Sequence, residues 1–199
     1  MQFIFLGPPG AGKGTQANVF ADRWQIPHIS TGEILRQAIA GKTSLGIQAQ
    51  DYVTAGELVP DTLIMAMVRE RFGKPDIKQG WILDGFPRTV AQAQALDELL
   101  LIVRQSHPQV LYLEVPTENL VTRLLARGRH DDSEATIRLR LDVYQSNTAA
   151  LIDLYRKRNR LITINGDQPS GAVTQTLEAA LLQSQYSSLE PLAASDSSQ

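Results

Sequence analysis

Short apolar runs alternate with longer segments of helical periodicity along this chain. Five mostly apolar runs bounded by turn-forming residues predict buried strands at 3–6, 26–29, 81–84, 110–115 and 161–164. Apolar residues at helical spacing predict helices at about 13–24, 34–40, 44–53, 61–72, 89–103, 118–126, 133–158 and 172–185. The alternation favours an α/β fold in which a five-stranded parallel sheet carries helices on both faces.

Several of the predicted helices begin at residues that can cap them. Ser44, Asp61 and Thr89 are expected N-caps, and residues 30–33 read as a capping segment, because short polar side chains accept hydrogen bonds from the first-turn N–H groups. From residue 187 onward the chain is rich in Ser and Ala with little apolar content, so residues 187–199 are expected to be a flexible tail.

Size and composition narrow the class of protein. A chain of 199 residues suits one α/β domain, here 1–186, with a substantial core. A formal charge of −2 argues against wholesale nucleic-acid binding. The chain has no Cys, which excludes disulfides and thiolate zinc sites, and no apolar run reaches the length of a membrane helix. These features predict a soluble cytoplasmic protein that binds neither nucleic acid nor membrane, and weakly favour a monomer.

The strongest motif is GPPGAGKGT at residues 7–15, directly after the first predicted strand. Small residues allow successive backbone N–H groups to wrap a phosphate, Lys13 adds a positive charge, and the next helix directs its positive end to the same place. The template G-x-x-x-x-G-K-[ST] wants a hydroxyl residue after the lysine, whereas here Gly14 precedes Thr15. The alternative is a Gly/Pro-rich turn without a ligand. The strand before it, the helix after it and the position of the lysine argue against that alternative.

Other candidate residues follow the remaining predicted strands. Ligands of open α/β sheets lie outside the carboxyl ends of the strands, so Asp84 at the end of the third strand is a candidate for holding Mg²⁺, directly or through water. Its alternative role is that of a turn residue in the segment DGFPR. Arg36 and Arg88 follow the second and third strands. A single bound nucleotide does not require this many cations. Two phosphorylated ligands that meet at this edge of the sheet do.

A second group of arginines surrounds residues 128–132. Arg123 and Arg127 are four residues apart and share a helical face, and Arg129 follows. These residues suit a mobile clamp on phosphate oxygens, although a pair at this spacing is often only a solvated surface. Arg138 and Arg140 on the following helix could extend this group, but only one of them can face it, because residues two apart do not share a helical face. The three histidines lack metal-ligand spacing, so they are interpreted as structural and no zinc is expected.

Four motifs together resemble the adenylate kinases, a family of nucleoside monophosphate kinases. They are GPPGAGKGT, ISTGEILR, DGFPRT and RHDDSEATIRLRL, and the resemblance extends over residues 1–185. It implies a phosphate-loop fold and reversible, Mg²⁺-dependent transfer of a phosphoryl group from ATP to AMP, giving two ADP. It also implies a core of 1–29, 60–127 and 133–186, a helical AMP-binding segment at 30–59 and a short lid at 128–132. Only three residues separate Arg127 from Asp131, where long-form members insert a lid domain, so a zinc-binding lid is not expected.

The resemblance also implies roles for individual residues. Catalytic roles fall to Lys13, Arg88, Arg123, Arg129 and Arg140. The ATP site would contain Gly10, Ala11, Gly12, Lys13, Gly14, Thr15, Arg127 and Gln168. The AMP site would contain Thr31, Arg36, Glu57, Leu58, Val59, Gly85, Phe86, Pro87, Arg88, Gln92, Arg129 and Arg140. Thr31 and Gln92 would read the adenine, and the metal residue would be Asp84. A uridylate or cytidylate kinase and an ATP-hydrolysing switch module are the alternatives.

Overall fold

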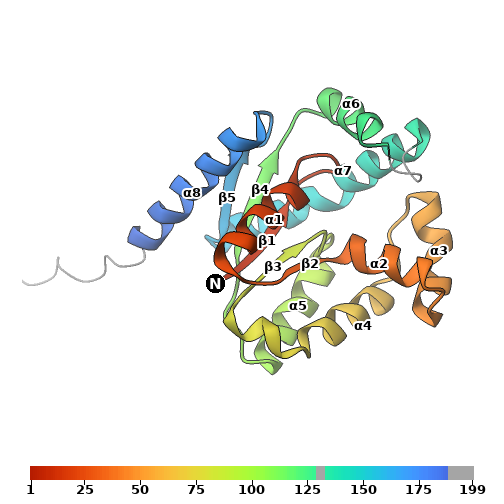
Figure 1. Ribbon diagram of the computed structural model, residues 1–199, viewed down its shortest axis with the longest axis horizontal. Helices are drawn as coiled ribbons and strands as arrows, with labels where there is room; N and C mark the ends of the chain where they lie inside the picture. The colour runs from red at the N-terminus through yellow and green to blue at the C-terminus, as the bar shows by residue number, and fades with distance from the viewer. Residues whose placement is uncertain (129–132, 188–199) are drawn as a thin grey trace, which may run out of the picture.

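The computed structural model describes residues 1–128 and 133–187, and its centre is a five-stranded, all-parallel sheet (Figure 1). The strand order is β2-β3-β1-β4-β5. The strands are β1 (Gln2–Leu6), β2 (His28–Ser30), β3 (Trp81–Asp84), β4 (Gln109–Glu114) and β5 (Leu161–Asn165). The predicted α/β fold with a parallel sheet is therefore confirmed. Strand β2 begins two residues later than expected, and the Ile26 N–H bonds to the Ala21 carbonyl near the end of α1.

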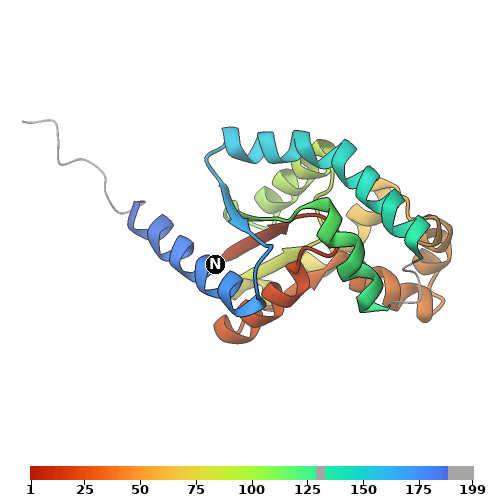
Figure 2. The same cartoon turned by 90° about the horizontal axis from the view of Figure 1, so that it is seen from above.

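Helices cover both faces of the sheet, as Figure 2 shows from above. The helices are α1 (Lys13–Trp24), α2 (Thr31–Ala40), α3 (Ser44–Ala55), α4 (Asp61–Phe72), α5 (Val90–Ile102), α6 (Thr117–Arg127), α7 (Glu134–Lys157) and α8 (Ser170–Ser187). One core cluster joins side chains of α4, α5 and the second half of α7 to the sheet, and the other joins α1, α6, α8 and the first half of α7 to its opposite face. Between α4 and β3 lies a short 3₁₀ helix, Pro75–Gln79, which the periodicity did not predict.

The helix starts confirm some of the predicted caps and correct others. Ser30 and Thr89 accept hydrogen bonds from the backbone N–H groups three residues ahead, as expected, and α2 therefore begins directly after Ser30. The Ser44 prediction is wrong, because the Thr43 hydroxyl takes the bond from Gly46 and caps α3. The Asp61 prediction is also wrong. Pro60 occupies the N-cap position of α4, and Asp61 is its first helical residue.

The parallel register brings the carboxyl ends of the three central strands to one edge of the sheet. Phe5 of β1 lies opposite Asp84 of β3 and Leu111 of β4, and Ser30 of β2 also lies opposite Asp84. The loop after β1, the start of α2 and the segment after β3 consequently emerge side by side. Helices α2 and α3 project beyond this edge, away from the sheet (Figure 1). Within the described residues, no helix is long and apolar enough to cross a bilayer.

Phe72 offers a test of how strongly the α4 face contributes to stability. Its ring is buried and meets Trp81 edge-on, with ring centroids 5.0 Å apart. Phe72→Ala is expected to lower the free energy of unfolding by about 3–5 kcal/mol, measured by urea denaturation, because it removes contacts and leaves a cavity. Leu101→Ala is the control: this side chain is 69% exposed on α5 and its loss should cost less than about 0.5 kcal/mol. Equal costs for the two variants would contradict the packing described.

Candidate functional site

A cavity of about 1300 Å³ opens at the carboxyl edge of the sheet. Pockets for one drug-sized ligand are usually about 300–1,000 Å³, so this space is larger than a single small ligand needs. Nineteen of the predicted site residues line it. They are Gly10, Gly12, Lys13, Gly14, Thr15, Thr31, Arg36, Glu57, Leu58, Val59, Asp84, Gly85, Phe86, Pro87, Arg88, Gln92, Arg123, Arg127 and Arg140.

The glycine-rich loop forms the floor of the cavity between β1 and α1. Gly10 has φ +84°, a backbone conformation that favours glycine, and a Cβ there would approach Leu124 Cγ to 3.0 Å. The Lys13 ammonium donates hydrogen bonds to the carbonyls of Gly7 at 2.8 Å and Pro8 at 2.9 Å. The lysine is thus folded back over its own loop, and α1 begins at the same residue. The loop therefore presents backbone N–H groups, a helix N-terminus and a cation at one place.

The charge of Lys13 is held in an unfavourable environment. Desolvation within the loop lowers the pKa of Lys13 to about 8, with a smaller opposing effect from Asp84 and further lowering by Arg88 and Arg127. Nearby cations repel one another in the absence of an anion. A polyphosphate placed here would relieve both the desolvation and the repulsion.

Asp84 lies at the end of β3, with its carboxylate beside the loop. A Cβ added at Gly14 would lie 3.4 Å from Asp84 Oδ2, so the residue after the lysine directly adjoins this carboxylate. Burial opposes ionisation of Asp84, but contact with His28 and the charges of Lys13 and Arg88 give a net lowering of its pKa. An ionised carboxylate next to a phosphate-binding loop has the chemistry required to hold Mg²⁺, directly or through water.

The segment after β3 meets the start of α2 on the other side of the cavity. Gly85 has φ +82°, and a Cβ there would approach the Thr31 hydroxyl to 2.9 Å, so glycine allows these two segments to pack closely. The Arg88 side chain donates through Nε to the Gly85 carbonyl at 2.9 Å. Gln92 is buried beneath them, and its carbonyl oxygen accepts a hydrogen bond from the Arg88 backbone N–H at 2.7 Å.

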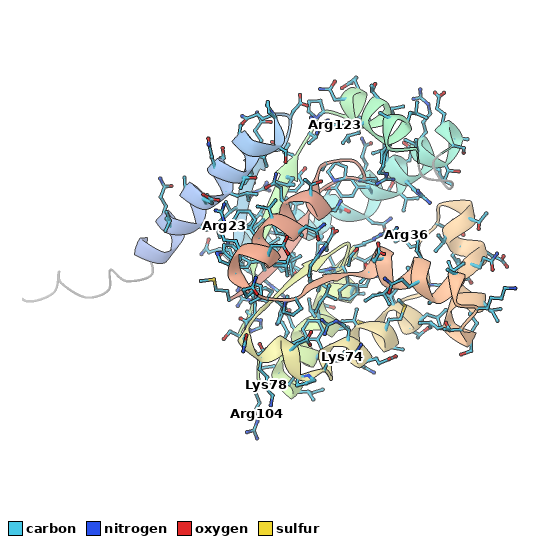
Figure 3. All side chains as sticks on the ribbon, viewed as in Figure 1. Arg23, Arg36, Lys74, Lys78, Arg104 and Arg123 are labelled. Carbon is cyan, nitrogen blue, oxygen red and sulfur yellow. The ribbon has the colours of Figure 1, made fainter. Side chains whose placement is uncertain are left out.

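The arginines reach the cavity from different elements; Figure 3 labels Arg36 on α2 and Arg123 on α6. Arg36 pairs with Glu33 at 3.0 Å. Arg140 of α7 donates to the Val53 carbonyl at 3.3 Å, which connects α7 to α3. Arg138 does not line the cavity and pairs with Glu134 on the exposed side, as expected for residues two apart on a helix.

Arg123 is turned toward the segment that follows β5. Its guanidinium donates to the Gly166 carbonyl at 3.1 Å and to Asp167 at 2.8 Å, and Asp167 also accepts from Asn119 at 2.8 Å. Gln168 follows directly and is exposed. In this structure, Arg123 therefore lies beside the predicted base-contacting turn.

Two of the predicted residues that the structure describes, Ala11 and Gln168, do not line the cavity. Ala11 is buried within the loop, where its N–H donates to the Pro8 carbonyl. Gln168 lies on the exposed turn beside Asp167. Arg129 lies outside the described residues, as does most of the predicted lid.

His28 and Asn18 are two polar residues of the cavity lining that were not predicted as parts of the site; His28 lies next to Asp84, and Asn18 lies next to His28. His28 lies with its Nε2 3.6 Å from Asp84 Oδ2 and its Nδ1 2.7 Å from the Asn18 side-chain oxygen. Both line the cavity, from β2 and α1. The sequence signal available was that His28 lies in the strand that ends at this edge of the sheet. Residues 1–128 and 133–187 contain no group of three or more His, Cys, Asp or Glu that could hold a metal ion.

The parallel sheet, the glycine-rich loop between β1 and α1 and the carboxylate ending β3 define the class as a phosphate-loop nucleotide-binding protein. The family model "Adenylate kinase" matches residues 5–160.

Adenylate kinase 1 of Nostoc sp. is 56% identical over 180 residues, covering 90% of this chain and 98% of that protein. Adenylate kinase 1 of Synechocystis sp. is 55% identical over 175 residues, covering 88% and 94%. The adenylate kinase of Leptospira biflexa is 47% identical over 180 residues, covering 88% and 97%. The chain belongs to the adenylate kinase family, which confirms the resemblance seen in its motifs.

Proposed function

We propose that this protein transfers the γ-phosphoryl group of Mg·ATP reversibly to AMP and so forms two molecules of ADP. The observation that carries the proposal is the shape of the cavity. One continuous space of about 1300 Å³ has the phosphate loop on one side and Thr31, Arg36, Arg88 and Gln92 on the other. Two nucleotides can therefore lie in it with their phosphates facing each other. One chain supplies all of these residues, so the proposed site is complete without a second copy, and a monomer is the proposed state.

The ATP phosphates occupy the loop in this proposal. Backbone N–H groups from Gly10 to Thr15 surround the β-phosphate, and Lys13 leaves its two carbonyl partners to bridge the β and γ groups. Arg127 contributes from the end of α6. Arg123 and Gln168 flank the nucleoside end, as the bonds of Arg123 to Gly166 and Asp167 suggest.

AMP occupies the other side. Arg36 and Arg88 bind its phosphate, and the backbone of Glu57, Leu58 and Val59 lines the base with Gly85, Phe86 and Pro87. Thr31 and Gln92 read the adenine. Both side chains are buried, so polar groups of the base have defined partners there and water competes little.

Magnesium fits the residues next to the loop. Asp84 is the acidic residue that would hold it, most simply through bound water, because Mg²⁺ usually retains several waters in nucleotide sites. The ion neutralises charge on the β and γ oxygens when it is bound. Gly14 provides no hydroxyl at the usual position, which gives the Asp84 carboxylate a larger share in holding the ion.

Positioning and charge neutralisation by the chain account for the chemistry. Phosphoryl transfer needs in-line placement of donor and acceptor and cancellation of charge on the moving group. The proposed catalytic cations that line the cavity come from four parts of the chain and are Lys13, Arg88, Arg123 and Arg140. Arg129 extends the group in the proposed lid. Water also has to be excluded, or ATP would be hydrolysed. We assign this closure to residues 30–59 over AMP and to residues 128–132 over ATP.

A coupled assay of ADP production, run with and without AMP, tests the proposed function. Formation of two ADP for each ATP consumed, dependent on AMP, is expected. ATP hydrolysis faster than AMP-dependent ADP formation would instead favour the switch-module alternative. A panel of acceptors addresses the other alternative, because faster turnover of UMP or CMP than of AMP would replace the proposed substrate.

The pKa of Lys13 predicts a pH dependence. The free protein keeps Lys13 charged below pH about 8 and loses that charge above it. Because only the charged form attracts phosphate, kcat/KM for ATP is expected to fall above pH 8 by up to roughly tenfold per pH unit. In the complex the phosphates favour the charged form, so kcat should fall less. Steady-state rates between pH 7 and 9.5 measure both, and a constant kcat/KM for ATP over this range would contradict the assignment.

A further inference from the structure

The Gln92 side chain is held from two sides by groups that belong to different parts of the chain. Its amide nitrogen donates to Asp61 Oδ1 at 2.6 Å, and its carbonyl oxygen accepts from the Arg88 backbone N–H at 2.7 Å. The backbone N–H of Gln92 in turn donates to the Thr89 hydroxyl at 3.2 Å. Gln92 is 2% exposed, so few waters can replace these partners.

The chemistry of the two partners fixes which end of the carboxamide is oxygen and which is nitrogen. An ionised carboxylate only accepts hydrogen bonds, and a backbone N–H only donates. Asp61 therefore requires the amide nitrogen, and Arg88 requires the carbonyl oxygen. If the carboxamide rotated by 180°, its oxygen would face the Asp61 carboxylate, so that two acceptors met. Its NH₂ group would face the Arg88 backbone N–H, so that two donors met. Such a rotation leaves the buried amide oxygen and nitrogen of Gln92 unsatisfied, which is costly.

Each end of the fixed carboxamide retains capacity for one further hydrogen bond. The NH₂ group has two donors and the oxygen two lone pairs, and one of each is already used. The 6-amino group and N1 of adenine form a donor and an acceptor side by side, which match one carboxamide orientation. A 6-oxopurine presents an oxygen acceptor and an N1–H donor in the same places. It matches the rotated carboxamide instead.

We propose that Asp61 is a positioning residue that, together with the Arg88 backbone N–H, orients the Gln92 carboxamide and thereby selects 6-aminopurine over 6-oxopurine monophosphates. This inference depends on the proposed reading of the AMP base by Gln92. Asp61 is suited to this role by its place. It is the first residue of α4, separated from the 30–59 segment by Pro60 alone, and its carboxylate reaches across to α5.

A simpler role for Asp61 is that of an acidic residue in the first turn of a helix, where its negative charge interacts favourably with the positive end of the helix dipole. Glu118 provides a matched control for that role. It lies in the first turn of α6, which, like α4, follows a Pro at the N-cap, and it is exposed and does not line the cavity. Removing Glu118 therefore tests loss of a first-turn carboxylate without touching Gln92.

The experiment compares kcat/KM for AMP with kcat/KM for inosine monophosphate, which carries the 6-oxo group. The proteins are the wild type, Asp61→Ala, Asp61→Asn, Glu118→Ala and Gln92→Leu, and a thermal melt of each checks folding. Asp61→Ala is expected to lower the AMP preference about tenfold, since a bidentate carboxamide–purine pair supplies discrimination of that order. Asp61→Asn retains an oxygen acceptor for the amide nitrogen and should restore most of the preference. Glu118→Ala should keep the wild-type ratio.

The outcomes separate this inference from the proposed site. If Gln92→Leu lowers the preference while Asp61→Ala leaves it unchanged, Gln92 reads the base but Asp61 does not position it, and the inference fails. Equal losses in Asp61→Ala and Asp61→Asn would also overturn it, because charge rather than the accepted hydrogen bond would then be responsible. If Gln92→Leu leaves the preference unchanged, the proposed base site itself is wrong.

Discussion

Lys13→Met is expected to lower kcat by about 10³-fold while the fold persists. The ammonium is the cation carried by the phosphate loop, and a single donor directed at developing charge contributes about 10²–10³-fold in other enzymes. In the proposed mechanism Lys13 also orients the transferred group, so loss of placement adds to loss of charge. Methionine retains the length of the side chain and removes only the ammonium. The measurement is the AMP-dependent rate of ADP formation at saturating ATP.

Stability distinguishes loss of function from loss of structure in this variant. Lys13 makes two hydrogen bonds to Gly7 and Pro8, but its charge is also desolvated, as its pKa of about 8 indicates. These contributions oppose each other, so the free energy of unfolding should change by no more than about 1 kcal/mol. Lys157→Met, which alters an exposed lysine in the last turn of α7, should leave both rate and stability as in the wild type. Turnover of Lys13→Met within tenfold of the wild type would remove Lys13 from the mechanism.

Arg88→Ala is expected to lower kcat/KM for AMP by about 10²–10³-fold. Arg88 lines the cavity, where its guanidinium interacts electrostatically with Asp84 and Arg140 and is anchored by a hydrogen bond to the Gly85 carbonyl. If it binds the AMP phosphate and also contacts the moving phosphoryl group, KM for AMP should rise and kcat should fall. KM for ATP should change much less, because the proposed site for that nucleotide is formed by Lys13 and the loop. Initial rates over a grid of ATP and AMP concentrations separate these effects.

A control for Arg88→Ala is available on the same protein. Arg156→Ala removes an arginine that pairs with Asp153 on the exposed side of α7, far along the helix from the cavity end. It should leave all three kinetic constants unchanged. A variant Arg88→Ala that raised KM for ATP more than KM for AMP would reverse the proposed placement of the two nucleotides.

Local sequence patterns predicted the elements well where the signal is contained within a few residues. The run 3–6 followed by GPPGAGKGT predicted a strand, a phosphate loop and a helix in that order, and the structure has them. The caps at Ser30 and Thr89 were predicted correctly for the same reason, since each bond spans three residues. Thr43 and Ser44 illustrate the limit: both can cap α3, and only the backbone geometry selects Thr43.

Side-chain partners that are distant in sequence were not predictable in this way. Asp61 was expected to cap a helix, but its carboxylate bonds to Gln92, 31 residues along the chain. Arg123 lines the cavity, and its bond to Asp167, 44 residues along the chain, was not predicted. His28 was interpreted as structural and lies beside Asp84. Each of these pairs depends on which strands are neighbours and how the helices pack.

From the sequence alone came the order of strands and helices, the phosphate loop and the family to which its motifs pointed, because hydrophobic periodicity, capping and glycine placement act over short distances. The tertiary structure alone decided how Asp61, Arg88 and Gln92 are paired and that Arg123 bonds to Asp167. Those arrangements arise from the parallel register of β1, β3 and β4 and from helix packing against the sheet, where contacts between distant segments determine the direction of every side chain.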